Sequence, residues 1–329
     1  MSMSDIYFDE NLTLRSGSCM VYLARYMLTL QPGDRIVTKS QLAKQYKVGV
    51  GTVQTALQRL EDIGGIRMNC RGHLGSFIES INIGILWKYS MYGYVRATMP
   101  LPHSDIFNGL AAGITSSWEN QEGIMLQMSY VNGSRKRVKN LQAGLNDFIV
   151  CSMIDAKSAI AEDPDLHVYL ELGPDTYMGD PAVLLREGVE LTNGIRVGID
   201  QASYDNKYLV QRAYQGLNVE FVPVNYNASS LFRVLRNKKI DSALWCRKDL
   251  PGRSFVGKVL LPDGFRDITE EAGTAVVLIH QKNREKMDAV HHFFNVEKIR
   301  KVQIDVISGE EIPNYIPRYG AGNIVGDLL

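Results

Sequence analysis

The feature that most limits the folds open to this chain is an apolar pattern in residues 50–63. Its apolar members recur every three or four residues: Val53, Ala56, Leu57, Leu60 and Ile63. This spacing predicts an amphipathic helix that is buried along one side and exposed along the other. Gly64 and Gly65 follow directly and predict the end of the helix.

Two shorter helical patterns precede this helix. Apolar residues at helical spacing in 18–30 predict a first helix. Thr38 is a good N-cap for a second helix of about two turns. A tight turn at 47–49 then leads into the long helix.

A β-hairpin with a basic tip is expected after the long helix. Strand-like runs at 66–68 and 76–78 flank Gly72, which suits a turn. A short helix, a tight turn, a longer helix and a hairpin together form the pattern of a winged helix-turn-helix domain. A small helical dimerisation or docking module is the alternative.

The charge distribution favours a polyanionic partner for this domain. The chain has 36 Lys+Arg and 36 Asp+Glu, so its formal net charge is zero. Residues 11–78 hold nine basic side chains against three acidic ones and carry +6. A basic segment in a neutral chain is typical of nucleic-acid binding, although chance surface charge would look the same.

The candidate contacts with double-stranded DNA are polar and basic side chains on the exposed faces. Those on the long helix can reach base edges or phosphates, and those on the hairpin can reach the backbone. The candidates are Lys39, Lys44, Lys47, Thr52, Gln54, Thr55, Gln58, Arg59, Arg67, Arg71 and His73. We expect Arg59 and Arg71 to contact phosphates and Gln54 to read a base.

The motif GTVQTALQRLE at 51–61 resembles the G-T-V-x-x-A-L-x-x-L-E signature of the GntR class of winged-helix regulators. Residues 38–48 are similar to that family's first recognition element, and residues 71–77 to its wing. The resemblance covers residues 18–80 and implies a domain that binds operator DNA.

Four positions differ from that family's usual pattern. Ser40, Val50 and Gln54 stand where many members have arginines, and Gly49 replaces a serine. These differences motivate an alternative to a regulator: a small-molecule-binding or protein-docking module with a weak or vestigial DNA-binding domain and no catalysis.

From residue 81 the pattern changes to alternating strands and helices. An apolar run at 82–87 predicts the first strand, and a second set of strands and helices begins at 195. This alternation predicts a mostly parallel sheet with helices on its faces. The repetition predicts two lobes, with strands at 182–186 and 274–279 crossing between them. A single large doubly wound domain is the alternative.

The order of these elements resembles the type II periplasmic-binding-protein-like effector domain. The pair of domains resembles the YhfZ family, in which a GntR-type helix-turn-helix is fused to such a domain. The resemblance implies an α+β winged helix-turn-helix domain followed by an α/β two-lobed domain. We expect the first domain at 1–80 and the second at 81–329, with lobe 1 at about 81–190 and 275–329 and lobe 2 at about 191–274.

A ligand is expected between the lobes, because α/β sheets bind ligands beyond the carboxyl ends of their strands. Polar and aromatic residues at those turns suit a small polar or anionic metabolite. The candidates are Trp87, Ser104, Ser152, Asp200, Ser203, Tyr204, Asn225, Ser229, Trp245 and Arg247. Helix capping by the serines and packing of the tryptophans are the structural alternatives. The tyrosine-rich stretch 88–102 is expected to be a lid or a dimer contact.

Neither an enzyme nor a cofactor is expected, because G-x-S-x-G, Walker and H-E-x-x-H motifs do not occur. The six histidines and four cysteines do not lie at metal-ligand spacing, and the acidic run at 162–165 predicts a solvated turn. No apolar run is long enough to span a membrane, and the acidic N-terminus lacks a signal peptide. We therefore expect a cytoplasmic protein without a membrane partner.

These patterns together predict a ligand-responsive bacterial transcriptional regulator. A metabolite bound between the lobes would change the relative position of two DNA-binding heads in a homodimer. The binding or docking module described above is the first alternative. A catalytic C-terminal domain is the second.

Overall fold

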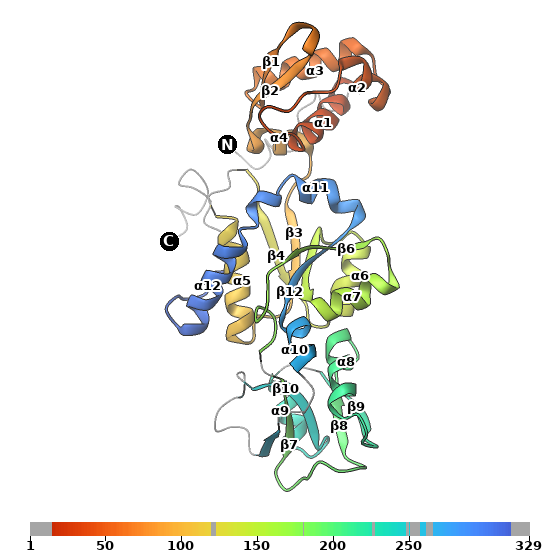
Figure 1. Cartoon of the computed structure of the whole chain (residues 1–329), viewed down its shortest axis with the longest axis vertical. Helices are drawn as coiled ribbons and strands as arrows, with labels where there is room; N and C mark the ends of the chain where they lie inside the picture. Colours follow the sequence, from red (N-terminus) through yellow and green to blue (C-terminus); the bar gives the residue numbers. More distant parts are fainter. Residues whose placement is uncertain are drawn as a thin grey trace.

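The computed structural model describes residues 15–119, 123–179, 181–225, 228–247, 250, 257–260 and 266–316. Three units follow one another along the long axis of the molecule (Figure 1). We call them the head, lobe 1 and lobe 2, in order from the N-terminal domain. The head and lobe 2 lie at opposite ends, and lobe 1 separates them.

The head has the expected winged helix-turn-helix order. A capping box begins the second helix: the Thr38 hydroxyl accepts from the Gln41 N–H, and the Gln41 side chain accepts from the Thr38 N–H. The elements are α1 (Arg15–Leu28), α2 (Lys39–Tyr46), α3 (Val50–Asp62), β1 (Ile66–Cys70) and β2 (Ser76–Ile81). The predicted stripe on α3 is buried, apart from Ile63, which is the half-buried C-cap.

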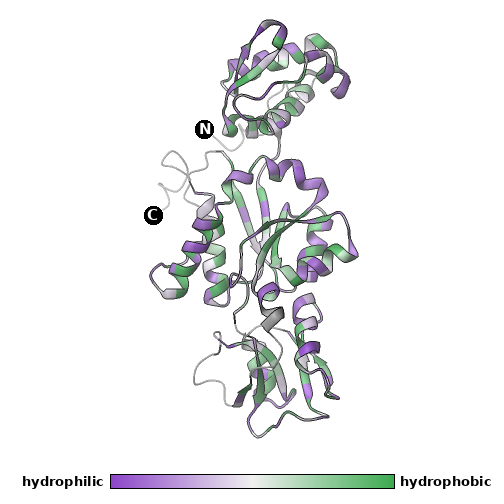
Figure 2. Ribbon diagram, viewed as in Figure 1, coloured by the Kyte–Doolittle hydropathy of each residue, from purple (hydrophilic) through white to green (hydrophobic). Residues whose placement is uncertain are grey.

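The predicted hairpin is confirmed as an antiparallel pair of β1 and β2. A single 3₁₀ turn at Gly72–Leu74 forms its tip. Gly72 and Gly75 adopt φ values of 56° and 97°, which glycine tolerates at little cost. In Figure 2 α2 is largely hydrophilic and the hairpin is mixed, whereas the strands of the two large sheets are largely hydrophobic.

The strand predicted at 82–87 is wrong, because these residues form helix α4 (Ile83–Ser90). The Asn82 side chain caps this helix by accepting from the Ile85 N–H at 3.0 Å. A short apolar run looks the same in a buried strand and in a buried helix, so its periodicity could not separate them. The stretch expected to be a lid instead contains the first strand of lobe 1, β3 (Val95–Met99).

Lobe 1 is a five-stranded sheet in the order β4-β3-β5-β12-β6. Strands β4, β3 and β5 are parallel, and β12 is antiparallel to β5 and β6. Helices α5 and α12 cover one face and α6 and α7 the other (Figure 1). The further strands are β4 (Leu126–Tyr130), β5 (Phe148–Ser152), β6 (Leu166–Glu171) and β12 (Ala275–His280). The helices are α5 (Asp105–Ser117), α6 (Ser134–Gln142), α7 (Met153–Glu162), α11 (Arg284–Asp288) and α12 (Val296–Ser308).

Lobe 2 is a second five-stranded sheet in the order β11-β7-β10-β8-β9. Strands β10, β8 and β9 are parallel, and β7 is antiparallel to both of its neighbours. The strands are β7 (Pro181–Arg186), β8 (Arg196–Ile199), β9 (Glu220–Pro223), β10 (Ser242–Cys246) and β11 (Gly257–Leu260). The helices are α8 (Tyr204–Ala213), α9 (Ala228–Arg236) and α10 (Arg266–Gly273), the last of which leads back to lobe 1.

Two segments cross between the lobes side by side. The Thr176 and Tyr177 N–H groups both donate to the Gly273 carbonyl at 2.8 Å, and the Ala275 N–H donates to Thr176 Oγ1 at 2.9 Å. The strand expected to cross at 182–186 is instead β7, a member of the second sheet. A boundary of lobe 1 near residue 190 would divide that sheet, so lobe 2 begins before β7. The apolar sequence of β7 indicated a buried strand but could not show which sheet this strand joins.

Candidate functional site

The exposed side of α3 has the polar side chains of a DNA-reading helix. Gln54, Thr55, Gln58 and Arg59 are exposed, and Thr52 is half-buried. One of them is engaged within the helix, because Gln58 Nε2 donates to Asp62 Oδ1 at 3.0 Å. The others leave amide, hydroxyl and guanidinium groups on the surface opposite the buried stripe.

Basic side chains surround this helix face. The candidate lysines Lys39, Lys44 and Lys47 are exposed on α2 and at its C-cap. Lys47 adopts φ 54°, a left-handed conformation that ends α2 and begins the tight turn to α3. Ammonium groups placed this way can pair with phosphates on either side of a groove.

The wing residues differ in how free they are to contact DNA. The Arg71 guanidinium lies 4.8 Å from the centre of the Phe77 ring, and His73 is exposed at the tip. Arg67 Nε is 3.2 Å from Glu79 Oε2, so part of its charge is already neutralised. Arg71 is therefore the best placed of these three for a phosphate.

Sequence reasoning missed one basic residue beside the wing. Arg35 bridges to Phe77, and a Cβ added at Gly75 would lie 3.0 Å from Arg35 Nε. The segment before α2 therefore lies beside β2 through a single antiparallel bridge. Only its basic charge, within a basic segment, could have marked it from the sequence.

The head is joined to lobe 1 through a shared hydrophobic core. Buried residues of α1 and α3, Trp87 of α4 and Val95 of β3 belong to one cluster. Trp87 is buried, and its indole N–H donates to the Gly93 carbonyl at 2.9 Å. Trp87 was predicted to bind a ligand, and this is corrected: it packs at the end of β3 that faces the head.

Polar contacts surround the same junction. Arg25 Nε of α1 donates to the Ser90 carbonyl at 2.9 Å, and its guanidinium lies 4.8 Å from the Tyr92 ring centre. The Tyr92 hydroxyl donates to Glu285 of α11 at 2.9 Å. Lys286 Nζ donates to the Tyr94 carbonyl at 2.7 Å. The segment 90–94, which links the head to lobe 1, is therefore bound by α1 on one side and by α11 on the other.

The carboxyl ends of β4, β3 and β5 meet at the edge of lobe 1 that faces lobe 2. The helices that follow these strands begin there, and Ser104 and Ser152 cap α5 and α7. In lobe 2 the Ser203 hydroxyl caps α8 in the same way. These three serines therefore act as N-caps, which was the structural alternative to a role in ligand binding. All three lie where the lobes face one another.

The lobes meet in a buried polar cluster that we call the inter-lobe cluster: Ser134, Ser152, Asp155, Tyr204 and Asp205. From lobe 2, the Asp205 N–H donates to Asp155 Oδ1 at 2.9 Å, and the Tyr204 N–H donates to Ser134 Oγ at 3.1 Å. From lobe 1, the Ser134 hydroxyl donates to Asp155 Oδ1 at 2.7 Å, and the Ser152 hydroxyl donates to Asp205 Oδ2 at 3.2 Å.

A buried arginine faces this cluster. The side chain of Arg137 is 2% exposed, and its Nη2 is 3.0 Å from the Tyr177 hydroxyl and 4.0 Å from Asp155 Oδ2. Burial, followed by repulsion from Asp205, raises the pKa of Asp155 to about 7. Burial also raises the pKa of Asp200, whose carboxylate accepts from the Ala202 N–H at 2.9 Å.

Aromatic rings cross between the lobes beside this cluster. The His103 ring lies 5.4 Å from Phe107 in lobe 1 and 6.1 Å from Trp245 in lobe 2. Phe107 in turn lies 5.1 Å from Tyr177. His103 is exposed and lies in the loop 102–104 that the sequence placed beside the ligand, although only Ser104 of that loop was chosen as a candidate.

The predicted ligand residues therefore fall into several groups. Ser152 and Tyr204 are occupied in the inter-lobe cluster, with Asp200 and Ser203 in the turn beside it. Ser104 and Trp245 flank the aromatic crossing. Asn225 and Arg247 are exposed at strand ends of lobe 2. The side chain of Ser229 lies outside the described residues.

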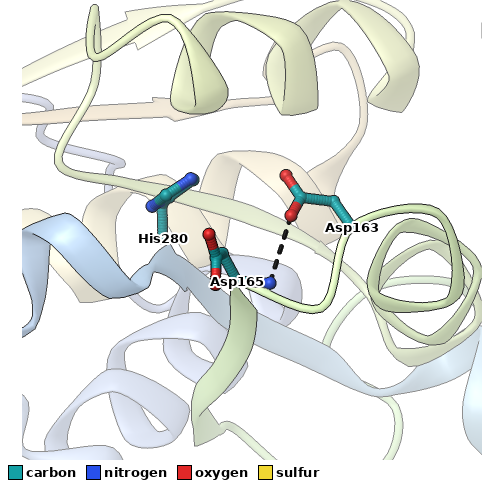
Figure 3. Close-up of side chains that lie close together, drawn as sticks. All are labelled: Asp163, Asp165 and His280. Carbon is teal, nitrogen blue, oxygen red and sulfur yellow. Dashed lines mark hydrogen bonds between the residues drawn. The ribbon is translucent and has the colours of Figure 1, made fainter.

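One group of side chains has the atoms of a metal site. Ligand atoms of Asp163, Asp165 and His280 lie within 4.8 Å of one another (Figure 3). They come from the turn before β6 and the end of β12, so their separation in the sequence concealed the grouping. Internal hydrogen bonds already engage two of them: Asp163 accepts from the Asp165 N–H and Gln142 Nε2, and His280 Nδ1 accepts from the Lys282 N–H. The predicted turn contains the two aspartates, whereas His280 comes from the end of β12.

No helix in the described ranges is long and apolar enough to cross a membrane.

Comparison with known proteins agrees with this architecture. A model of the YhfZ C-terminal domain matches residues 83–315, and a helix-turn-helix domain model matches residues 31–78. A protein described as uncharacterized protein YhfZ of Escherichia coli K12 is 31% identical over 305 residues, which cover 92% of this chain and 98% of that protein.

Solved structures resemble the chain as well. The crystal structure of YhfZ from Shigella flexneri is similar with a TM-score of 0.59 and 27% identity, over 71% of this chain and 98% of that one. The ligand-binding component of an ABC-type import system from Staphylococcus aureus, with zinc bound, aligns with a TM-score of 0.48 and 13% identity, over 68% of this chain and 80% of that one. The helix-turn-helix head, the two-sheet α/β domain and the family model that spans most of the chain lead to one conclusion: this protein belongs to the YhfZ family.

Proposed function

We propose that the protein is a ligand-responsive transcriptional regulator that binds operator DNA through the head and a small metabolite between the lobes. The observation that carries this proposal is the exposed face of α3, with its amides, hydroxyls and Arg59, flanked by basic groups on α2 and the wing. Because operator DNA lies in the cytoplasm of a bacterium, we propose that the protein acts there.

In this proposal α3 enters the major groove and the wing contacts the backbone. Gln54 reads a base edge, and Arg59, Arg71 and the lysines of α2 pair with phosphates. Two heads of a homodimer, one helical turn apart, would read the two halves of a palindromic site.

The ligand is proposed to lie at the aromatic crossing between the lobes. Ser104 and His103 line this place in lobe 1, and Trp245 faces them from lobe 2. Arg247 follows the same strand of lobe 2 and is exposed, so it offers a positive charge to an anionic group. Aromatic surface with a few polar groups suits a small polar or anionic metabolite.

Ligand binding would act by moving lobe 2. The head and lobe 1 share a hydrophobic core, so they are expected to move as one body. A ligand that binds the closed lobes better than the open lobes shifts the population toward closure. In a dimer this movement changes the spacing of the two heads, and hence the affinity for DNA.

DNA binding is tested by selecting sites from random and genomic DNA and then measuring affinity over about 50–200 mM salt. Arg59→Ala and Arg71→Ala should each weaken binding to all DNA and reduce the salt slope by about 1. Gln54→Ala should cost about 1–3 kcal/mol on the selected site and nothing on random DNA. Arg212→Ala, on α8 of lobe 2, is the control. Unchanged slopes in both arginine variants would remove them from the interface.

The ligand is tested by a thermal-shift screen of phosphorylated sugars, amino acids and carboxylates. A compound that raises the melting temperature of the wild type should fail to do so with Trp245→Ala. A hit that is consumed during incubation would indicate catalysis instead.

One observation favours the alternative of a binding module with a weak DNA-binding domain. Val50, in the first turn of α3, is 46% exposed, and Gly49 before it provides no side-chain cap. An apolar side chain at this position forms no contact with a phosphate. Failure to select any DNA fragment at low salt would favour this alternative.

A further inference from the structure

The backbone of lobe 2 is bound directly by side chains of lobe 1 at the start of α8. The Tyr204 and Asp205 N–H groups are the first two of this helix, and they donate to Ser134 Oγ and Asp155 Oδ1. Such N–H groups have no partner within their own helix. Asp155 of lobe 1 therefore supplements the cap of a helix in lobe 2.

A third backbone contact lies next to these two. The Arg135 N–H donates to the Ala202 carbonyl at 3.0 Å. The chains approach so closely here that a Cβ added at Gly133 would lie 2.8 Å from the Ala202 Cβ. The lobes therefore approach so closely at Gly133 and Ala202 that a larger side chain at residue 133 would not fit.

The inter-lobe cluster holds two carboxylates against one cation. Asp155 is fully buried and Asp205 is 9% exposed, while Arg137 is the arginine that faces them. Asp155 Oδ2 accepts no hydrogen bond from the described residues and has Arg137 Nη2 at 4.0 Å. Two ionised carboxylates here would leave a net negative charge buried, which is costly.

We propose that Asp155 is a proton-dependent latch between the lobes, which holds them docked while its carboxyl group carries a proton and weakens when that group ionises. The latch lies at the N-terminus of α8, so its release frees lobe 2 to move relative to lobe 1 and the head.

The groups packed around Asp155 leave this residue as the one that titrates near neutral pH. The titratable and charged neighbours are Arg137 of α6, Cys151 of β5, Tyr177 of the crossing segment, and Tyr204 and Asp205 of α8. Asp200, in the turn before α8, interacts with Asp205 and Arg137, and burial raises its pKa. Burial raises the pKa of Cys151 and of Tyr177 well above their ordinary values, so both stay neutral. Burial also raises the pKa of Tyr204, to about 12. Burial disfavours the charged form of Arg137, but the acidic groups around it outweigh this effect and raise its pKa, so Arg137 stays charged.

The sign of the pH effect follows from the raised pKa of Asp155. The docked lobes hold this proton up to about pH 7, whereas separated lobes would release it near the ordinary value of about 4. Docking therefore takes up one proton. It is strongest below about pH 4, weakens up to tenfold for each pH unit above that, and levels off beyond about pH 7.

Hydrogen–deuterium exchange of the full chain tests this latch, because the amides of Tyr204 and Asp205 report docking directly. After correction for intrinsic exchange, protection at residues 202–206 should fall about tenfold from pH 6 to pH 8 in the wild type. Asp155→Asn keeps an oxygen acceptor but cannot ionise, so its protection should not change over this range. Asp175→Asn, exposed and at φ 60°, is the matched control and should behave like the wild type.

Equal protection of the wild type at both pH values, or a tenfold fall that persists in Asp155→Asn, would overturn the latch. If Asp155→Asn does not fold, Ser134→Ala provides the second test. The Ser134 hydroxyl stabilises the ionised form of Asp155, so its removal should move the loss of protection to higher pH at the Asp205 amide, which donates to Asp155 rather than to Ser134. An unmoved midpoint, or one at lower pH, would contradict the proposal. Neither DNA nor a ligand enters this experiment, so its outcome is independent of the proposed function.

Discussion

The head meets lobe 1 through buried apolar side chains, whereas lobe 1 meets lobe 2 mainly through buried hydrogen bonds and charges. The first contact is part of one hydrophobic cluster that includes Trp87. The second is the inter-lobe cluster around Asp155. Few apolar side chains cross beside it: Ile154 of α7 packs in a cluster of lobe 2, and Tyr204 of α8 packs in a cluster of lobe 1. Apolar burial is insensitive to pH and holds at many geometries, while a buried polar contact requires exact partners and the correct charge. The first junction suits a fixed attachment and the second suits a contact that opens and closes.

The largest expected effect is at the apolar junction. Trp87→Ala should reduce the free energy of unfolding by about 3–5 kcal/mol, because it leaves a cavity in the core that the head shares with lobe 1. Chemical denaturation followed separately in the head and in lobe 1 should change from coincident to separate transitions. Tyr208→Ala, which truncates an exposed ring on α8, is the control and should cost far less. Coincident transitions in Trp87→Ala would mean that the coupling of the two domains does not depend on Trp87.

The next largest effect is expected from a substitution that disturbs the contact between the lobes without changing any charge. Gly133→Ala should cost about 1–3 kcal/mol, because the residue has φ 85° and its new methyl group would meet Ala202. Exchange protection at residues 202–206 should be lost while the head remains protected. Gly188→Ala, at φ 73° with no atom within 4 Å of its added Cβ, isolates the backbone strain. If the control loses the same protection, the close approach at Ala202 is unimportant.

The smallest effect concerns an exposed ion pair between the lobes. Lys157 of α7 lies 2.6 Å from Glu271 of α10, and both side chains are about half exposed. Lys157→Met should change stability by at most about 1 kcal/mol, since solvent screens such pairs. Thermal unfolding at low and high salt measures this contribution. A larger loss would show that surface charge, rather than the inter-lobe cluster, holds the lobes together.

The head could be predicted from the sequence because each of its signals is local. The stripe on α3, the cap at Thr38 and the glycines of the wing all act within a few residues of the chain. The order of strands and helices in the lobes was also visible, because buried strands are continuous apolar runs.

The errors lie where distant contacts decide the structure. Residues 83–87 begin a helix that packs in the core shared by the head and lobe 1, and the local signal for it, the N-cap Asn82, was not used. The strand β7 joins the second sheet through pairing with β10 and β11, which follow much later in the chain. The inter-lobe cluster combines three distant segments, around residues 134, 155 and 205. Of its members, only Ser152 and Tyr204 were among the candidates chosen from the sequence.

The two adjacent crossing segments make lobe 2 an insertion in lobe 1. The chain leaves after β6 and returns to β12, and these strands are neighbours in the same sheet. At the point of exit and return, the Thr176 N–H is 2.8 Å from the Gly273 carbonyl. A whole folding unit can therefore be exchanged at this site without cutting the sheet that supports the head. Lobe 2 is thus free to diverge during evolution while the head keeps its sequence and its fold.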